Sequence, residues 1–220
     1  MMTTPRAPGT ARDPPRGSGL AWGGPARRPA SVARSTLLTA MLGGAAALAH
    51  AAPQSYAIDP EQTHIHWELR HFGTSTSRGR FDDITGSITM DREARRGEAS
   101  ITIATGSVST GFAPYDGVVR GPYVLSTTAF PKAYFVSNRF VFEGDRLTAV
   151  EGVLTLRDIG RALTLRALRF SCRTDTDPPR EVCGGDFEAE FPRSAYEVTH
   201  SLPFVADKVR VVIQIEAARR

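Results

Sequence analysis

The sequence of 220 residues lacks the motifs by which several enzyme classes are recognised. It contains no Gly-x-Ser-x-Gly turn that would present a nucleophilic serine, and no glycine-rich phosphate loop. It also offers no cysteine–histidine pair with a free thiol, although a nucleophile must be oriented by a base. The sequence therefore predicts no enzyme and no catalytic residue. A site assembled across separate strands is the alternative.

Long apolar runs are scarce, and the most extended one lies near the N-terminus. Residues 1–35 are rich in Pro, Gly, Ala and Arg and show no apolar periodicity, so no core is expected there. The next stretch is shorter than the ~20 residues of a membrane span and ends in Ala49-His50-Ala51. We expect a low-complexity lead and secretory signal peptide over 1–51, with cleavage after Ala51. The domain over 52–220 would then be periplasmic or secreted; an N-terminal membrane anchor is the alternative.

A strong excess of one charge is absent from the expected mature domain. The whole chain has 27 Lys+Arg and 23 Asp+Glu, but residues 1–51 carry six of the former and one of the latter. Residues 52–220 therefore carry 21 against 22, a net charge of −1. Without a basic excess, net charge gives no reason to expect nucleic-acid binding.

Cysteine is rare, and its two occurrences, Cys172 and Cys183, fall in the expected mature domain. Between them lies a polar segment with two prolines, RTDTDPPREV, which predicts a loop. In an oxidising compartment two cysteines that flank such a loop favour a disulfide. Two free thiols or a metal-binding pair are the alternatives.

The chain is rich in apolar and polar residues that alternate with a period of two, which is typical of half-buried β-strands. About eight such stretches follow one another with turn residues between them and no alternating helices. This pattern predicts an all-β protein, either an eight-stranded antiparallel barrel or a sandwich. Residues 111–131 break the alternation and predict a short irregular or helical excursion. The clearest rows are Ile65, Trp67, Leu69 and His71 in one stretch, and Val209, Val211, Ile213, Ile215 and Ala217 in another.

Two histidines, His64 and His66, resemble a metal-binding pair. Strand alternation places both on the polar face, about 7 Å apart, whereas Glu68 lies about 13 Å from His64 along the strand. A catalytic zinc ion requires three protein ligands, and this strand supplies only the pair. The sequence therefore predicts two solvated histidines and no metal site.

A resemblance to a known family covers residues 55–217. The segment from Tyr56 to Ile88 contains YAIDPEQTHIHWELRHFGTSTSRGRFDDITGSI, which resembles the opening of the YceI-like family of exported, lipocalin-like proteins that bind polyisoprenoids and other long-chain lipids. The motif FPKAYFVS and the pair Arg193-Ser194 also fall in the family's register. Departures occur at Arg157-Asp158, where the family has a histidine-glycine turn, and at Glu197, where it has glycine.

The resemblance implies a lipocalin-like barrel that binds a long-chain isoprenoid or another lipid, with no other cofactor. Branched and aromatic side chains would form an apolar tunnel, and Gly86, Ala99 and Gly152 are expected to leave space in it. An alkyl chain would gain about 0.8 kcal/mol for each buried methylene. A solid core without a cavity is the alternative. The expected lining residues are Ile65, Trp67, Leu69, His71, Phe81, Ile84, Ile88, Ile101, Ile103, Leu154 and Leu156, with Val211 also inside.

Three polar residues near the expected tunnel mouth have two interpretations each. His71 either donates to a lipid headgroup or bonds a backbone carbonyl. Arg78 and Arg80, which flank Gly79, either pair with a phosphate or are solvated surface residues. Transient contact with a membrane or a membrane protein is also open.

Overall fold

The structure is a computed structural model that describes residues 52–220; the expected signal peptide and its cleavage site lie outside the described residues. These residues form strands connected by turns, one α-helix and two short 3-10 helices. The elements are β1 Gln54–Ile58, β2 His64–His71, β3 Ser75–Phe81, β4 Ile84–Asp91, β5 Arg96–Ala104, η1 Thr105–Ser107, β6 Val108–Ser109, α1 Ala113–Arg120, β7 Lys132–Glu143, β8 Arg146–Leu156, β9 Ile159–Thr176, β10 Pro179–Pro192, η2 Arg193–Tyr196 and β11 Lys208–Arg219.

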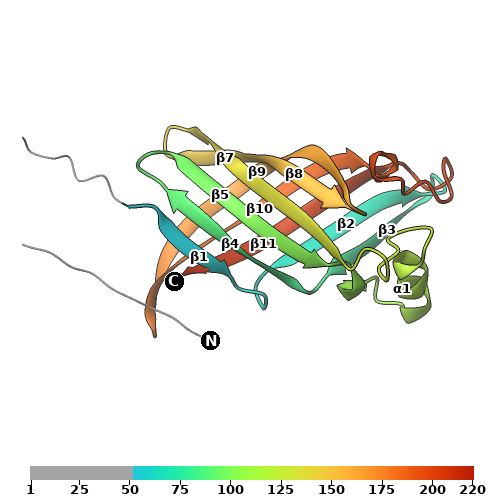
Figure 1. Ribbon diagram of the computed structural model, residues 1–220, viewed down its shortest axis with the longest axis horizontal. Helices are drawn as coiled ribbons and strands as arrows, with labels where there is room; N and C mark the ends of the chain where they lie inside the picture. Colours follow the sequence, from blue (N-terminus) through green and yellow to red (C-terminus); the bar gives the residue numbers. More distant parts are fainter. Residues whose placement is uncertain (1–51) are drawn as a thin grey trace, which may run out of the picture. The chain divides into compact units, whose positions relative to one another are not determined.

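Eight of the strands form a closed antiparallel barrel, as the sequence predicts (Figure 1). Their order around the ring is β1-β4-β5-β7-β8-β9-β10-β11, and β11 returns to pair with β1. In this closing pair Tyr56 lies opposite Arg219 and Ile58 opposite Ala217. Full closure leaves no unpaired edge within the ring, and its apolar rows point inward to form the core.

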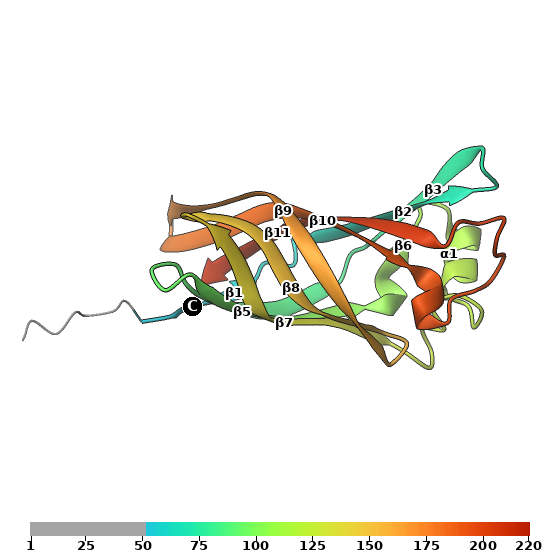
Figure 2. The same ribbon diagram turned by 90° about the horizontal axis from the view of Figure 1, so that it is seen from above.

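Strand β11 changes partner along its length. Its first part pairs with β2, from Arg210 opposite Glu68 to Gln214 opposite His64, before its last residues pair with β1. Strands β2, β3 and β6 continue the sheet from there, at the end of the barrel where α1 lies (Figure 2). The row that contains Trp67 therefore belongs to a wall extension beside the eight-stranded ring.

The excursion expected over residues 111–131 contains helix α1 followed by turns. Pro114 occupies the first turn, where its missing N–H is not needed, and Gly121-Pro122 follows the last residue. The Asp116 carboxylate accepts hydrogen bonds of 2.6 Å from both the backbone N–H and the hydroxyl of Thr110. These bonds fix the entry to the helix. Within residues 52–220, no helix combines the length and the apolar character that crossing a bilayer demands.

The cysteine segment corrects one expectation. The disulfide between Cys172 and Cys183 is confirmed, but the residues between them form a β-hairpin, not a loop. Strand β9 continues to Thr176 and β10 starts at Pro179, so the two cysteines lie directly opposite each other. The β9–β10 backbone ladder continues from the cysteines to Thr176 opposite Pro179, and Arg173 also lies 3.1 Å from Asp175 on its own strand and 3.3 Å from Glu216 of β11.

Glycines inside the barrel do not open space for a ligand, contrary to expectation. A Cβ at Gly152 would lie 2.6 Å from the ring of Phe135, which covers the glycine from the neighbouring strand. A Cβ at Gly86 would collide with the backbone of Ser100. Neighbouring side-chain and backbone atoms therefore occupy the space beside these glycines, and any cavity must lie elsewhere in the barrel.

At two turns where the family has glycine, this chain has other residues, and these residues adopt left-handed backbone conformations. The turn residues Arg157 and Asp158 have φ values of 51° and 61°, and Glu197, which ends η2, has a φ of 58°. For an L-residue other than glycine this conformation costs about 1–2 kcal/mol. The sequence here accepts strain at two turns where glycine would be relaxed.

Replacing Glu197 with glycine should therefore raise the free energy of unfolding by about 1 kcal/mol, because glycine is unstrained at a left-handed helix end. Urea unfolding followed by circular dichroism measures the change. Glu98→Gly, in the extended strand β5, is the matched control and should lower stability by about 0.5–1 kcal/mol. Equal losses in the two variants would show that Glu197 is not strained.

Candidate functional site

The barrel interior contains two apolar cavities. The larger has a volume of about 290 Å³ and lies at the α1 end, whereas the smaller has about 60 Å³. Both are bordered by Ile101, Phe135 and three further shared residues, Leu165, Ile213 and Ile215, which separate them. Protein interiors normally leave few voids larger than a water molecule. A void of 290 Å³ is therefore a distinctive feature of this fold.

Ten of the eleven residues expected to line a tunnel lie around the larger cavity. Ile88 is the exception: it lines the smaller cavity, beside Tyr56 and Met90. Ile88 is displaced because β4 runs away from the α1 end, so its later residues face the other half of the barrel. The ten residues at the larger cavity are Ile65, Trp67, Leu69, His71, Phe81, Ile84, Ile101, Ile103, Leu154 and Leu156.

Sequence reasoning missed the part of the wall that comes from α1 and the chain after it. The helix contributes Tyr115, Val118 and Val119, whose spacing of three and four residues places them on one helical face. This spacing in the sequence could have indicated that the helix turns an apolar face toward the barrel. Further lining residues that were not predicted are Val124, Leu125, Ala133, Phe135, Leu163, Phe191, Val198, His200, Ser201 and Val205.

Trp67 forms one side of the cavity wall. Its ring covers Gly79 on β3, the residue directly opposite in the ladder. Its indole N–H is buried and has no hydrogen-bond acceptor among the described residues. A buried polar group without a partner is costly, so the site holds one unused donor in an otherwise apolar wall.

Arg193 is a cation buried at the edge of the same cavity, with 6% of its surface exposed. Its Nε donates to the carbonyl of Ala206, and its terminal nitrogens donate to Val198 and Val205, at 2.8–2.9 Å. Burial lowers the pKa of the guanidinium, and the nearby Asp207 carboxylate opposes that shift. The three bonds hold residues 198–206 around the cavity, a role that the sequence did not reveal.

The polar residues expected near the mouth take different positions. His71 lies in the cavity wall, forms a bridge with Val205 and contacts the ring of Phe72 at 4.7 Å between centroids. Arg78 and Arg80 are exposed and form ion pairs with Glu68 at 3.1 Å and with Asp82 at 2.6 Å. Neither arginine lines the cavity, so both are solvated surface residues.

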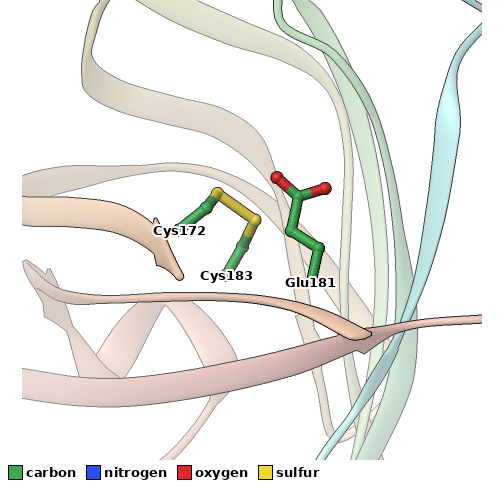
Figure 3. Close-up of side chains that lie close together, drawn as sticks. All are labelled: Cys172, Glu181 and Cys183. Carbon is green, nitrogen blue, oxygen red and sulfur yellow. A yellow bond between two sulfur atoms is a disulfide. The ribbon is translucent and has the colours of Figure 1, made fainter. Parts of the chain in front are cut away.

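A single cluster of possible metal ligands occurs among residues 52–220: Cys172, Glu181 and Cys183 (Figure 3). Its two sulfur atoms are joined in the disulfide, and the Glu181 carboxylate accepts from the Tyr56 hydroxyl at 2.8 Å and from Arg92 at 2.6 Å. Burial, followed by the bond to Glu181, raises the pKa of Tyr56. These contacts close the barrel at the small-cavity end and leave no free ligand set.

The histidines His64 and His66 lie outside that cluster. Their ring centroids are 6.4 Å apart, and His66 is exposed as expected. His64 is not solvated as expected: it is half-buried, and its Nδ1 atom is buried and has no hydrogen-bond partner among residues 52–220. Strand β2 turns the faces inward and outward that the sequence predicts: Ile65 and Trp67, which alternate with the two histidines, face the cavity.

Comparison with known proteins adds a family and a fold. The model of the YceI-like domain matches residues 56–217. "Protein YceI" of Salmonella arizonae is 29% identical over 168 residues, which cover 75% of this chain and 87% of that protein.

Two solved structures share the barrel. BcnA of Burkholderia cenocepacia aligns with a TM-score of 0.61 at 20% identity, over 72% of this chain and 98% of its own. A polyisoprenoid binding domain from Saccharophagus degradans aligns with a TM-score of 0.57 at 16% identity, over 76% and 99%. At these identities the likeness shows the lipocalin-like fold.

Proposed function

The chain belongs to the YceI-like family, and from that premise we propose that it is a binding protein, not an enzyme, which holds a long-chain isoprenoid or another amphiphilic lipid in its larger cavity. The wall supports an apolar ligand because strands β2, β5, β8 and β11 all turn branched or aromatic side chains toward it. The Saccharophagus degradans domain of the same fold is described as binding polyisoprenoid.

The observation that carries the proposal is the cavity of about 290 Å³. An enclosed, unfilled cavity in a protein core costs about 24 cal/mol per Å³, so about 7 kcal/mol is the upper limit for a cavity of this size, whose mouth opens to solvent. The total stability of a domain is only about 5–15 kcal/mol. An alkyl or isoprenoid chain would remove that cost and gain about 0.8 kcal/mol for each buried methylene.

The polar groups at the α1 end favour a ligand that enters with its apolar tail first. His71, His200 and Ser201 border the larger cavity at this end, whereas the wall toward the smaller cavity is made of Ile101 and Phe135. A headgroup would therefore remain near the histidines while the tail extends into the barrel. The unpaired indole N–H of Trp67 is one donor available to a polar atom of the ligand.

The proposal includes export to the periplasm or the cell exterior. The disulfide supports an oxidising compartment, because cytosolic thiols are kept reduced. N-terminal sequencing of the protein recovered from that compartment should give Ala52 as the first residue. A mature protein that begins before Arg34 would contradict the expected cleavage.

Organic extraction of the purified protein, followed by mass spectrometry, tests the binding function. We expect a long-chain lipid in an amount close to one molecule per chain, and the stripped protein should take up the same lipid again. Protein that extracts without lipid and takes none up would contradict the proposal and favour a solid barrel. A ligand that is chemically changed after incubation would instead indicate an enzyme.

A further inference from the structure

Large apolar side chains are exposed together at the α1 end of the barrel. Exposed residues of this type also occur on the barrel wall, at Tyr134, Val136, Val153 and Leu168, but those lie on the outer face of strands β7, β8 and β9. We call the group at the α1 end the apolar rim. It consists of Phe72, Phe112, Val118, Tyr123 and Phe204, which expose 56%, 63%, 51%, 72% and 64% of their surface.

The apolar rim is continuous with the mouth of the larger cavity. Val118 belongs to both, and Phe72 follows the cavity residue His71 in the chain. Tyr123 stacks on His200, another cavity residue, with 5.7 Å between ring centroids. The rim is carried by the β2–β3 turn, by α1 with the residues on either side of it, and by the loop between η2 and β11, and these three segments gather at one end of the barrel (Figures 1 and 2).

The apolar rim is held in a fixed arrangement. The rings of Phe72 and Phe204 stack with 5.8 Å between centroids and 16° between planes. The backbone N–H of Phe72 also donates to the carbonyl of Phe204 at 2.8 Å, and that of Ala206 donates to the carbonyl of Arg70 at 2.9 Å. Two loops from distant parts of the chain thus present a preformed aromatic surface.

Charge differs slightly between the two ends of the barrel. The segments of the rim end, residues 70–75, 80–83, 110–132, 157–161 and 193–208, contain eight Lys or Arg and six Asp or Glu. The segments of the opposite end, residues 91–96, 143–146, 175–181 and 219–220, contain seven Lys or Arg and seven Asp or Glu. The apolar rim therefore lies at the slightly more positive end of a domain whose net charge is close to zero.

We propose that the apolar rim docks on the surface of a bilayer that contains anionic phospholipids. Aromatic side chains favour the level of the headgroups, and each Lys or Arg near an anionic surface contributes about 1 kcal/mol. Docking would place the cavity mouth against the lipid, so that an apolar ligand could pass between membrane and barrel without crossing water. The proposal concerns the outer surface, and its test does not depend on which lipid fills the cavity.

Vesicle flotation tests the docking. The protein is isolated in the N-terminal form that the producing cell makes, and every variant is compared in that form. Wild type should float with vesicles of phosphatidylcholine and phosphatidylglycerol, and less with phosphatidylcholine alone or at high salt. The double variant Phe72→Ser/Phe204→Ser should lower the partition coefficient about tenfold or more, because two apolar rings leave the interface.

The matched control is Val136→Ser/Val153→Ser, which removes two exposed apolar residues that face each other across β7 and β8. It should float like wild type. If the first double variant does not fold, as judged by circular dichroism, Phe112→Ser/Tyr123→Ser tests the rim from the α1 segments. Equal flotation of rim and wall variants, or no flotation of wild type, overturns the proposal. Absent flotation together with a rim-dependent cross-link to a membrane protein would assign the surface to that protein.

Discussion

Replacing Arg193 with methionine should lower the free energy of unfolding by about 3–5 kcal/mol, although methionine keeps most of the buried volume. The arginine is the donor for three carbonyl groups, those of Val198, Val205 and Ala206. Each buried acceptor left without a donor costs about 1–3 kcal/mol. Urea unfolding monitored by circular dichroism measures the loss.

Two control variants separate this network from ordinary surface charge. Arg193→Lys keeps the positive charge but cannot reach three carbonyls at once, so its stability should fall between wild type and the methionine variant. Arg80→Met removes an exposed arginine with a single ion pair and should change stability by less than about 1 kcal/mol. A loss below about 1 kcal/mol in Arg193→Met would show that the loop is held by other contacts.

Filling the larger cavity with a protein side chain should lower the bound lipid at least about tenfold. Ala133 is buried on β7 and lines that cavity, so Ala133→Trp places an indole ring where the ligand tail would lie. Because the ring fits into the empty cavity, overpacking should lower the free energy of unfolding by only about 1–3 kcal/mol. Extraction and mass spectrometry give the lipid content per folded chain.

Ala162→Trp is the matched control, because Ala162 is exposed on β9 and the same ring there projects into water. It should keep the wild-type lipid content. Folding of both variants is checked by circular dichroism and by the urea midpoint. Full lipid content in a folded Ala133→Trp protein would place the ligand outside this cavity, whereas equal losses in both variants would indicate a general effect of the substitution.

The barrel and about a third of the cavity wall could be predicted because they depend on local alternation. In β2 a period of two fixes Ile65, Trp67 and Leu69 on one face, and burial of an apolar row then decides which face turns inward. The same argument located the rows of β5, β8 and β11. Short turns between successive rows led to the antiparallel arrangement without knowledge of any long-range contact.

The remainder of the site depends on contacts that alternation does not encode. Arg193 looks like a surface cation in the sequence, and only the fold brings Ala206 and Val205 to its nitrogens. Gly152 suggested open space, but the ring that covers it comes from Phe135 on the adjacent strand. The segment between Cys172 and Cys183 is polar and contains two prolines, which predicts a loop, whereas its strands are held by the β9–β10 backbone ladder.

The double pairing of β11 has a consequence for the order of folding. Among the elements of residues 52–220 this strand is the last, and two of its partners, β1 and β2, are the first two, so their contacts span more than 140 residues. Contacts of such high sequence separation carry a large loop-closure entropy and fold slowly. The ring cannot close, and the cavity cannot form its complete wall, until the C-terminal residues are available. A chain that crosses a membrane unfolded would therefore acquire its complete cavity only after strand β11 has arrived.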